Sequence, residues 1–408
     1  MTGDRPASPE LARVLRGQLC SGCGGCAALA PGKISMTVSP AGYNRPVQTA
    51  ALTAEEESTF AAICPGVGLI QSAEGRKDHP LWGPLIAVRS GHASDPDLRH
   101  NASSGGVLSA VLIHLIETGA VEFVLQVAAD PAHPLGNLTV ISRTAAEIFA
   151  AAGSRYSPSS PLAGLEAHLV PGRRFAFVGK PCDVAALRAL ARYDSRIDAC
   201  IPYMISFFCA GIPSLKGAEE IVHKLGVELA QVTAFRYRGD GWPGFATATL
   251  TDGNTRRMSY NDSWGGILTG HIQFRCKICP DGTGGFADLV CADAWHCDEA
   301  GYPLFDEGDG ISLIVSRTAK GENLLASAMT AGVIQAEPLP VAQIAAMQPG
   351  QAGRKKILLA RLLALWVLFR PRPSYRGFHL GRAACMAGLA KNLRNFLGTG
   401  RRILLKRR

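Results

Sequence analysis

The sequence predicts a mixed α/β protein, with an α/β (α+β) body preceded by a cysteine-rich module and followed by a C-terminal helical tail. Short apolar runs of strand type alternate with helical segments through residues 80–338. Cysteines gather near the N-terminus, and Lys and Arg gather near the C-terminus. With 408 residues, of which 47% are hydrophobic and 18% charged, the chain is long enough for two or three domains with hydrophobic cores.

Four N-terminal cysteines follow the spacing of a ferredoxin-type 4Fe–4S cluster, in which three closely spaced thiols are joined by a distant Cys-Pro. They are Cys20, Cys23, Cys26 and Cys64. Gly22, Gly24 and Gly25 give the loop the freedom to curl around a cluster with its N–H groups directed at the sulfides. Zinc is one alternative, although zinc sites usually combine two separated Cys-x-x-Cys pairs.

A disulfide pair is the other alternative, and it would need an oxidising compartment. Residues 1–10 are polar and lack the apolar segment of a signal peptide, so we expect a cytoplasmic chain with reduced thiols. Residues 1–75 are therefore predicted to form a ferredoxin-like 4Fe–4S module. Within it we expect a short helix over Ala51–Ala62, and after it a polar linker over 72–83.

The first part of the body, residues 80–165, combines two predicted strands and a helix. The strands are expected over Leu85–Val88 and Val121–Val127, and the helix over 108–119, where a glycine signals its end. His114 lies on the apolar face of this helix and is expected in the core.

A turn of two serines and two glycines enters this helix. It consists of Ser103, Ser104, Gly105 and Gly106, followed by Val107. Free N–H groups and the helix dipole would attract an anion there, and the glycines permit close approach, so the turn is a candidate phosphate site. The alternative is an ordinary helix cap formed by one of the serines.

The second part of the body, residues 166–338, places two cysteines after consecutive strands. A strand is predicted over Arg174–Val178, followed by a turn that contains Cys182 and a helix over 183–191. The next strand, over 201–208, ends at Cys209. Because ligands bind at the carboxyl ends of parallel strands, we expect both thiols at one functional edge of the sheet.

A Cys-x-x-Cys pair completes a second set of four thiols. The set is Cys182, Cys209, Cys276 and Cys279, which is enough for a second cubane cluster. A structural zinc or a redox dithiol would use the same residues, and spacing alone leaves these alternatives open.

Further elements are predicted downstream. Strands are expected at 245–250 and 310–318, and a helix at 321–330; another strand would begin at Asp288 and leave Asp293 beyond its end. Most of the remaining cysteines are expected to be buried apolar thiols, with one of them, Cys291, held as a substitute ligand. They are Cys200, Cys291, Cys297 and Cys385.

The C-terminal segment 339–408 reads as a basic helical tail. From Arg354 onward it holds 15 Lys and Arg and no Asp or Glu, so the net charge of +9 belongs to the tail and does not indicate nucleic-acid binding by the body. Helices are predicted over Ile357–Phe369 and Met386–Leu397. Basic helices with apolar faces suit peripheral contact with an anionic membrane, and packing on the body or on an acidic partner is the alternative.

Several motifs together resemble one family, that of the coenzyme F420 (deazaflavin) hydrogenase/dehydrogenase beta subunits. The family also holds 7-hydroxymethyl chlorophyll a reductase and ferredoxin-dependent vinyl reductases. The motifs are Ser104-Gly105-Gly106-Val107, Gly179-Lys180-Pro181-Cys182, Phe208-Cys209-Ala210-Gly211, Cys276-x-x-Cys279-Pro280-Asp281, Ala287-Asp288, Asp293-Ala294-Trp295 and Arg317-Thr318-x-x-Gly321. The resemblance covers roughly residues 80–330, and the N-terminal cysteines complete it.

The resemblance implies a flavin-binding body that holds FAD, a 4Fe–4S cluster beside the FAD, and a second cluster in the ferredoxin-like module. The second set of thiols would bind the cluster beside the flavin. The flavin would be held by Ser103, Ser104, Gly105, Gly106, Val107, Gly179, Lys180, Asp281 and Asp293. Lys180 and Asp293 are the candidate catalytic residues. Two positions depart from the usual family pattern, Ala292 in place of Gly and Lys180 in place of Thr.

The implied activity is that of an iron–sulfur flavoprotein oxidoreductase. Reduced ferredoxin, or another one-electron donor, would supply electrons that leave as a hydride to a small-molecule acceptor. Exchange with the deazaflavin coenzyme F420 is the main alternative. A third is an electron-transfer subunit that has no substrate of its own.

Overall fold

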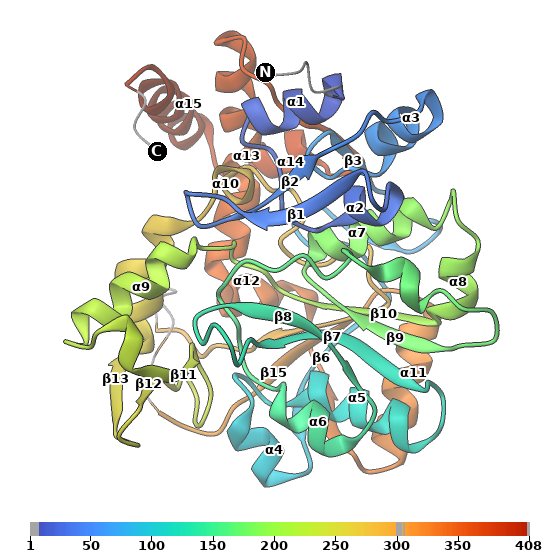
Figure 1. Ribbon diagram of the computed structural model, residues 1–408, viewed down its shortest axis with the longest axis vertical. Helices are drawn as coiled ribbons and strands as arrows, with labels where there is room; N and C mark the ends of the chain where they lie inside the picture. The colour runs from blue at the N-terminus through green and yellow to red at the C-terminus, as the bar shows by residue number, and fades with distance from the viewer. Residues whose placement is uncertain (1–7, 299–303, 305–306, 406–408) are drawn as a thin grey trace.

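The computed structural model describes residues 8–298, 304 and 307–405, and it confirms a mixed α/β architecture. A large sheet occupies the middle of the molecule, with helices on both faces (Figure 1). In the order in which the strands lie side by side, the sheet contains β16 (Ile334–Pro338), β6 (Ala87–Ala93), β15 (Ser312–Ser316), β14 (Leu289–Asp293), β10 (Tyr203–Phe207), β9 (Phe175–Val178), β7 (Phe123–Ala129) and β8 (Asn137–Ser142). Strands β14, β10, β9 and β7 are parallel, and the outer strands pair antiparallel.

Smaller β elements surround this sheet. They are the pair β1 (Ile34–Val38) and β2 (Asn44–Gln48), the pair β3 (Gly68–Ile70) and β17 (Ser374–Arg376), the hairpin β4 (Lys77–His79) and β5 (Gly83–Leu85), and a sheet of β11 (Val232–Arg236), β12 (Phe245–Leu250) and β13 (Thr255–Ser259). The β4–β5 hairpin corrects the prediction of a linker over 72–83. Strands of three residues leave too short a periodicity to be recognised in a polar sequence.

Helices cover both faces of the large sheet. The N-terminal and body helices are α1 (Pro9–Arg16), α2 (Gly25–Leu29), α3 (Ala54–Ile63), α4 (Pro96–Asn101), α5 (Val107–Glu117), α6 (Ala145–Ala150), α7 (Pro181–Leu190), α8 (Arg196–Cys200), α9 (Leu215–Lys224), α10 (Phe274–Lys277) and α11 (Ala319–Thr330). One face packs on α5 and α11, and the other on α7 and α8, so each face buries its own apolar core.

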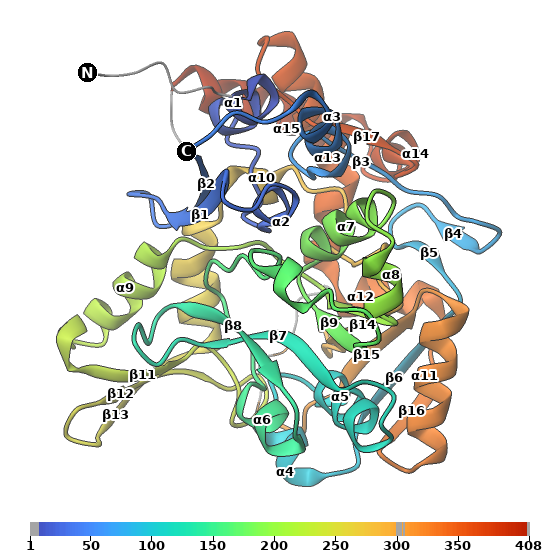
Figure 2. The same ribbon diagram turned by 45° about the vertical axis from the view of Figure 1, so that its right-hand side comes forward.

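The C-terminal helices do not form a separate tail. They are α12 (Ile344–Met347), α13 (Pro349–Val367), α14 (Leu380–Cys385) and α15 (Leu389–Leu404). Leu358, Leu362 and Leu365 of α13 share a core with Leu11 and Val14 of α1. Both ribbon views accordingly show the N-terminal segment and the C-terminal helices side by side at one end of the molecule (Figures 1 and 2).

Most of the predicted elements are confirmed, with shifted ends. The helix expected at 183–191 begins earlier, at Pro181, because proline suits a first helical position. Asp293, expected beyond its strand, is the last residue of β14. Of the charges predicted in the tail, Lys406, Arg407 and Arg408 lie outside the described residues. Within the described residues, no helix has the length and apolar character needed to cross a membrane.

Candidate functional site

The first four cysteines line one small cavity between α1, α3 and the loop that leads into α2. Apolar side chains such as Leu11, Met36 and Phe60 complete its wall. Burial, and then the neighbouring thiols of Cys23 and Cys20, raise the pKa of Cys64 to about 12. Burial and the other three thiols likewise hold the pKa of the fourth, Cys26, well above its ordinary value. We call Cys20, Cys23, Cys26 and Cys64 the outer quartet.

The glycines of the outer quartet are required by the backbone. Gly22 and Gly24 have φ values of 81° and 86°, which L side chains rarely adopt. A Cβ atom on Gly24 would lie 2.6 Å from the backbone nitrogen of Ala163 in the body. The next amide, that of Gly25, lies 3.4 Å from the sulfur of Cys23. The loop therefore turns the amide of Gly25 toward a thiol of the quartet.

The second four cysteines gather where β9 and β10 end. These strands are parallel neighbours; Cys182 follows β9 in the first turn of α7, and Cys209 follows β10. Burial, and then Cys276 and Cys279, raise the pKa of Cys209 to about 12. The expectation that both strand ends bring their thiols to one edge is confirmed. We call Cys182, Cys209, Cys276 and Cys279 the inner quartet.

The two quartets are neighbours. After burial and Asp183, the charges that act on the thiol of Cys182 include both Cys209 of the inner quartet and Cys23 of the outer quartet. Arg275, which precedes Cys276 of the inner quartet, also joins the two quartets. It donates at 2.8 and 3.2 Å to the carbonyl of Pro65, which follows Cys64 of the outer quartet.

Arg275 is 1% exposed and, within the described residues, pairs with no carboxylate. Burial opposes its charge, but Tyr375 and the thiols of the inner quartet raise its pKa. A buried cation is stable only beside compensating negative charge. Thiolates in both quartets would supply that charge, so the surroundings suit an anionic iron–sulfur centre.

The donor set therefore fits two 4Fe–4S clusters in the chemistry of its ligands: eight thiols in two groups of four, with buried surroundings and backbone N–H groups directed at sulfur. Among the described residues, no three His, Cys, Asp or Glu side chains converge as they would around a single metal ion.

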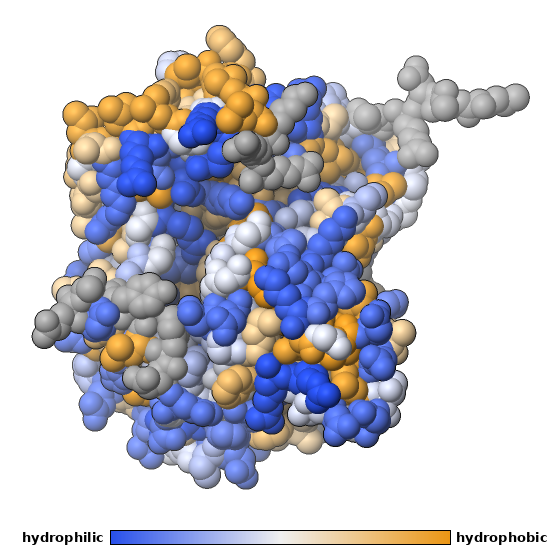
Figure 3. All heavy atoms as spheres, turned by 90° about the vertical axis from the view of Figure 1, so that its left-hand side faces the viewer, coloured by the Kyte–Doolittle hydropathy of each residue, from blue (hydrophilic) through white to orange (hydrophobic). Residues whose placement is uncertain are grey.

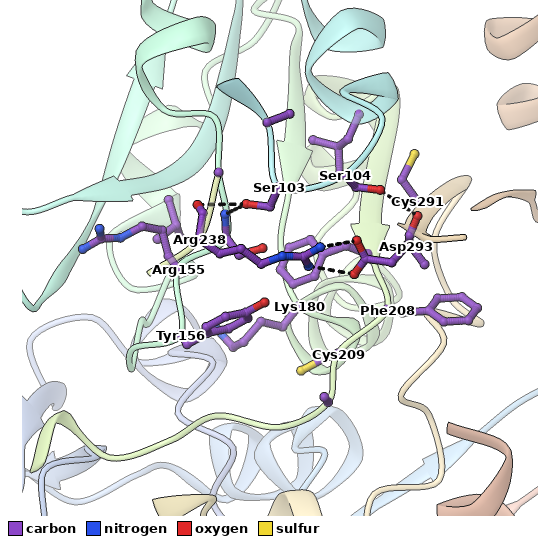
Figure 4. Close-up of a pocket in the computed structure, with 18 of the residues that line it drawn as sticks. Ser103, Ser104, Arg155, Tyr156, Lys180, Phe208, Cys209, Arg238, Cys291 and Asp293 are labelled. Carbon is purple, nitrogen blue, oxygen red and sulfur yellow. Dashed lines mark hydrogen bonds and ion pairs between the residues drawn. The ribbon is translucent and has the colours of Figure 1, made fainter. Parts of the chain in front are cut away.

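A cavity of about 290 Å³ lies beside the inner quartet, with Cys209 in its wall (Figure 4). It reaches the N-terminus of α5, where Ser104, Gly106 and Val107 line it. The N-cap residue of the helix is Gly106, with φ 75°, and within the described chain no side chain caps this end. Its first N–H groups therefore remain available to an anion.

The serines before α5 do not cap it, which corrects the alternative considered for them. The hydroxyl of Ser103 donates to the carbonyl of Arg238 at 3.1 Å and accepts from the amide of Ser154. The hydroxyl of Ser104 lies 3.0 and 3.2 Å from the carbonyls of Ile311 and Ala292. These bonds hold the turn in place, and Ser103, Ser104 and Gly106 of the turn line the cavity.

Lys180 lines the cavity and is 4% exposed. Its ammonium group lies 2.8 Å from the carboxylate of Asp183 and donates to the hydroxyl and carbonyl of Ser159 at 2.8 and 3.2 Å. Burial works against the charge, yet Asp183 raises the pKa of Lys180. The ammonium group is thus held charged at the boundary between the cavity and the inner quartet.

Asp293 forms a bidentate ion pair with Arg238, whose Nη atoms lie 2.9 and 2.8 Å from its two oxygens (Figure 4). The indole N–H of Trp242 donates to the same carboxylate at 3.1 Å. The guanidinium also lies over the rings of Tyr260 and Trp295, 4.7 and 4.8 Å from their centroids. Because both of its carboxylate oxygens accept hydrogen bonds, Asp293 holds Arg238 and Trp242 in place in this wall of the cavity.

Two predicted flavin-binding residues do not line the cavity. Gly105 packs against the sheet, where a Cβ would lie 2.6 Å from the amide nitrogen of Ser312. Asp281 is 3% exposed and accepts the amide of Gly285 at 2.9 Å. Gly179 and the remaining residues predicted to bind the flavin do line it.

The prediction that most of the other cysteines are buried is wrong, because they divide evenly between the interior and less buried positions. Cys291 and Cys200 are buried, whereas Cys297 is half-buried and Cys385 is exposed. Cys291 lines the cavity, and burial alone raises its pKa to about 12. His114 is buried as predicted, and its Nε2 lies 2.9 Å from the hydroxyl of Ser327.

Sequence reasoning missed the cations and aromatics of the cavity wall. Arg155, Arg238, Tyr156 and Trp264 all line it, and Arg275 lies between the quartets. The only available signal was the position of Arg238 in a turn rich in glycine and aromatic residues. A lone Arg in such a turn is usually exposed, so its burial depends on contacts distant in sequence.

The comparisons with known proteins place the chain among oxidoreductases and identify its family. The chain belongs to the coenzyme F420 hydrogenase/dehydrogenase beta-subunit family. The family model for the N-terminal part of this beta subunit matches residues 88–166, and the family model for its C-terminal part matches residues 172–341. The predicted resemblance is confirmed.

The individual relatives are named for different activities. The chain is 27% identical to coenzyme F420 hydrogenase subunit beta from Methanococcus voltae, over 70% of this chain and 98% of that protein. It is 25% identical to chloroplastic 7-hydroxymethyl chlorophyll a reductase from Oryza sativa subsp. japonica, over 57% of this chain and 47% of that protein.

A solved structure shares the fold. It is the xenon-derivatised F420-reducing NiFe hydrogenase complex from Methanosarcina barkeri, one chain of which aligns with a TM-score of 0.53 and 20% identity. The alignment covers 70% of this chain and 96% of that chain.

Proposed function

We propose that the chain is an iron–sulfur flavoprotein oxidoreductase that receives single electrons from reduced ferredoxin and reduces a small-molecule acceptor by hydride transfer. The observation that carries the proposal is the adjacency of three features: the outer quartet, the inner quartet and the cavity. When bound, two 4Fe–4S clusters would supply one-electron chemistry and FAD would supply conversion to two-electron chemistry.

Each group of site residues has a separate role in this proposal. The two quartets would hold the clusters, and Arg275 and Lys180 would offset the negative charge of the thiolates. The uncapped N-terminus of α5 would accept a flavin phosphate, with Ser103 and Ser104 fixing its turn. We propose that Lys180 faces the flavin ring and that its positive charge stabilises an anionic form of the flavin or acceptor. Asp293 would orient Arg238 in the opposite wall.

A second candidate is a beta subunit that exchanges hydride with the deazaflavin coenzyme F420. It is favoured by the 27% identity to coenzyme F420 hydrogenase subunit beta over nearly the whole of that protein. A third candidate is an electron-transfer subunit that serves a partner enzyme, because the solved structure that shares the fold is a chain of a hydrogenase complex.

Anaerobic purification with metal and flavin analysis tests the proposal. The full chain should contain about eight iron atoms per molecule and one FAD. Replacing one cysteine of each quartet by serine, Cys23→Ser and Cys279→Ser, should each lower the iron content. Cys385→Ser is the matched control, because this cysteine is exposed and outside both quartets, and it should leave the iron content unchanged. A preparation that holds zinc without iron or flavin would contradict the proposal.

The electron donor is tested separately, by following the visible flavin absorbance under anaerobic conditions. Reduced ferredoxin and reduced coenzyme F420 are each mixed with the oxidised protein. Bleaching by ferredoxin alone supports the leading proposal, whereas bleaching by coenzyme F420 alone supports the second candidate. If a reduced preparation transfers electrons to a partner protein but to no small molecule, the third candidate is supported.

A further inference from the structure

The last helices of the chain differ in how they use their apolar residues. Helix α13 buries Leu358, Leu362 and Leu365 in the core that it shares with the N-terminal segment. Helix α15 packs against α13 along one side, where Ile403 joins that core and Gly400 lies next to Leu368. The other sides of α15 are open to solvent.

Large apolar side chains are exposed along α15 and near the ends of α13 and α14. They are Leu363, Trp366, Val367, Phe369, Met386, Leu389, Leu393, Leu397, Leu404 and Leu405, and we call them the C-terminal ridge. Figure 3 shows hydrophobic residues collected across the end of the molecule where α13, α14 and α15 lie. A large apolar area on the surface of a protein marks a contact with a partner or a membrane.

Phe369 gives the clearest sign that the ridge serves a contact. Its side chain is 96% exposed, and its backbone φ is 51°. It follows the C-cap of α13, where the amide of Arg370 donates to the carbonyl of Leu365 and the amide of Phe369 donates to that of Trp366. This is a Schellman ending, whose left-handed position favours glycine. A bulky aromatic there costs stability and gains no contact within the fold.

The segment that carries the ridge holds charges of one sign. No Asp or Glu occurs from residue 354 to the end of the chain. Arg394 and Arg401 are exposed on α15 beside the stripe of Leu393 and Leu397, and Arg370 is exposed next to Phe369. Arg394 and Arg401 are seven residues apart and so lie on the same side of α15, and Arg401 follows Leu397 by four residues, which puts it at the border of the apolar stripe. A basic rim around apolar side chains complements a surface that is both anionic and apolar.

We propose that the C-terminal ridge docks the protein on an anionic lipid membrane as a peripheral contact. Phe369 and the leucines of α15 would enter the acyl boundary, Trp366 would lie at the headgroup level, and the arginines would contact lipid phosphates. An acidic protein would satisfy the arginines, but the most exposed members of the ridge, Phe369 and Leu389 at 96% and 86%, present bare aliphatic and aromatic surface that suits acyl chains better.

Vesicle co-sedimentation of the full chain tests the proposal. Vesicles of pure phosphatidylcholine are compared with vesicles that also contain phosphatidylglycerol. We expect binding to the anionic vesicles and little to the neutral ones. The variant Phe369→Gly should weaken binding about tenfold or more, since it removes one large apolar side chain from the contact. The variant Arg394→Gln with Arg401→Gln should weaken binding by about fivefold per charge removed.

The Phe369→Gly variant separates loss of binding from loss of folding. Glycine suits the left-handed position, so its melting temperature should equal or exceed that of the unmodified protein. Tyr193→Ser is the matched control, because Tyr193 is an exposed aromatic near α8, away from the ridge, and this variant should bind vesicles normally. Three outcomes would overturn the proposal: no binding to anionic vesicles, undiminished binding by Phe369→Gly, or ridge-dependent binding of an acidic ferredoxin without any binding of vesicles.

Discussion

The ion pair between Arg238 and Asp293 offers a quantitative test of how the cavity wall is held. The guanidinium is 2% exposed and donates to both carboxylate oxygens, at 2.9 and 2.8 Å. Asp293→Asn keeps the shape of the side chain but leaves a buried cation without its counter-charge. Breaking a buried pair costs about 3–5 kcal/mol, and the 20% exposure of the Asp293 side chain puts the expected loss near the lower bound, about 3 kcal/mol.

Urea unfolding followed by tryptophan fluorescence measures this loss. The double variant Arg238→Met with Asp293→Leu removes both charges, and it should recover most of the stability because apolar side chains then replace the pair. Binding of FAD should weaken in Asp293→Asn, since both partners line the cavity. The reasoning is refuted if Asp293→Asn stays within about 1 kcal/mol of the unmodified protein, or if the double variant is less stable than the single one.

Three further predictions concern the quartets and their surroundings. Gly24→Ala should lower the melting temperature more than Gly32→Ala, because both have positive φ but only at Gly24 would a Cβ meet backbone, at 2.6 Å; equal losses would contradict this. Arg275→Met should cost about 1–3 kcal/mol in urea unfolding by leaving the carbonyl of Pro65 unsatisfied, and should lower the iron content after anaerobic reconstitution; an unchanged protein would argue against the role of this cation. Burial lowers the pKa of Lys355 to about 8 in the folded, metal-free chain, whereas in the unfolded chain it stays near its ordinary value of about 10.4. Between these pH values only the unfolded chain keeps the proton, so the free energy of unfolding, relative to that of Lys355→Met, should rise by about 3 kcal/mol from pH 8 to 10.4. Parallel pH curves for the two proteins would refute this.

The cysteine quartets could be predicted because their information is local or ordered along the chain. The outer quartet depends on two-residue gaps with glycines between them, which restrict the loop wherever it lies. The inner quartet depends on two strands that end in cysteine, and strands of apolar residues are recognisable from composition. That β9 and β10 lie side by side follows from the rule that consecutive parallel strands neighbour each other.

The cations of the site could not be predicted for the opposite reason. An arginine in a sequence window looks like a surface residue, and only the folded chain reveals that Arg238 and Arg275 are 2% and 1% exposed. Packing on the body was only an alternative for the tail, and the partner of α13 was not predicted, on similar grounds. Its apolar stripe predicted a helix with a buried face, but the partner of that face, the N-terminal segment around Leu11, lies more than 300 residues away in sequence.

The placement of α13 bears on how the site is maintained. Arg354 and Gln351 in its first turns donate to the carbonyl of Cys209 at 3.0 and 3.1 Å, and Lys355 donates to the carbonyl of Pro280 at 2.7 Å. One helix thus contacts the backbone at or next to two members of the inner quartet and, farther along, packs on the module that carries the outer quartet. Because the same helix ends at the C-terminal ridge, a contact made there would act on a rigid element that reaches both quartets. Membrane attachment would then orient the outer quartet relative to the bilayer without requiring any change in the body.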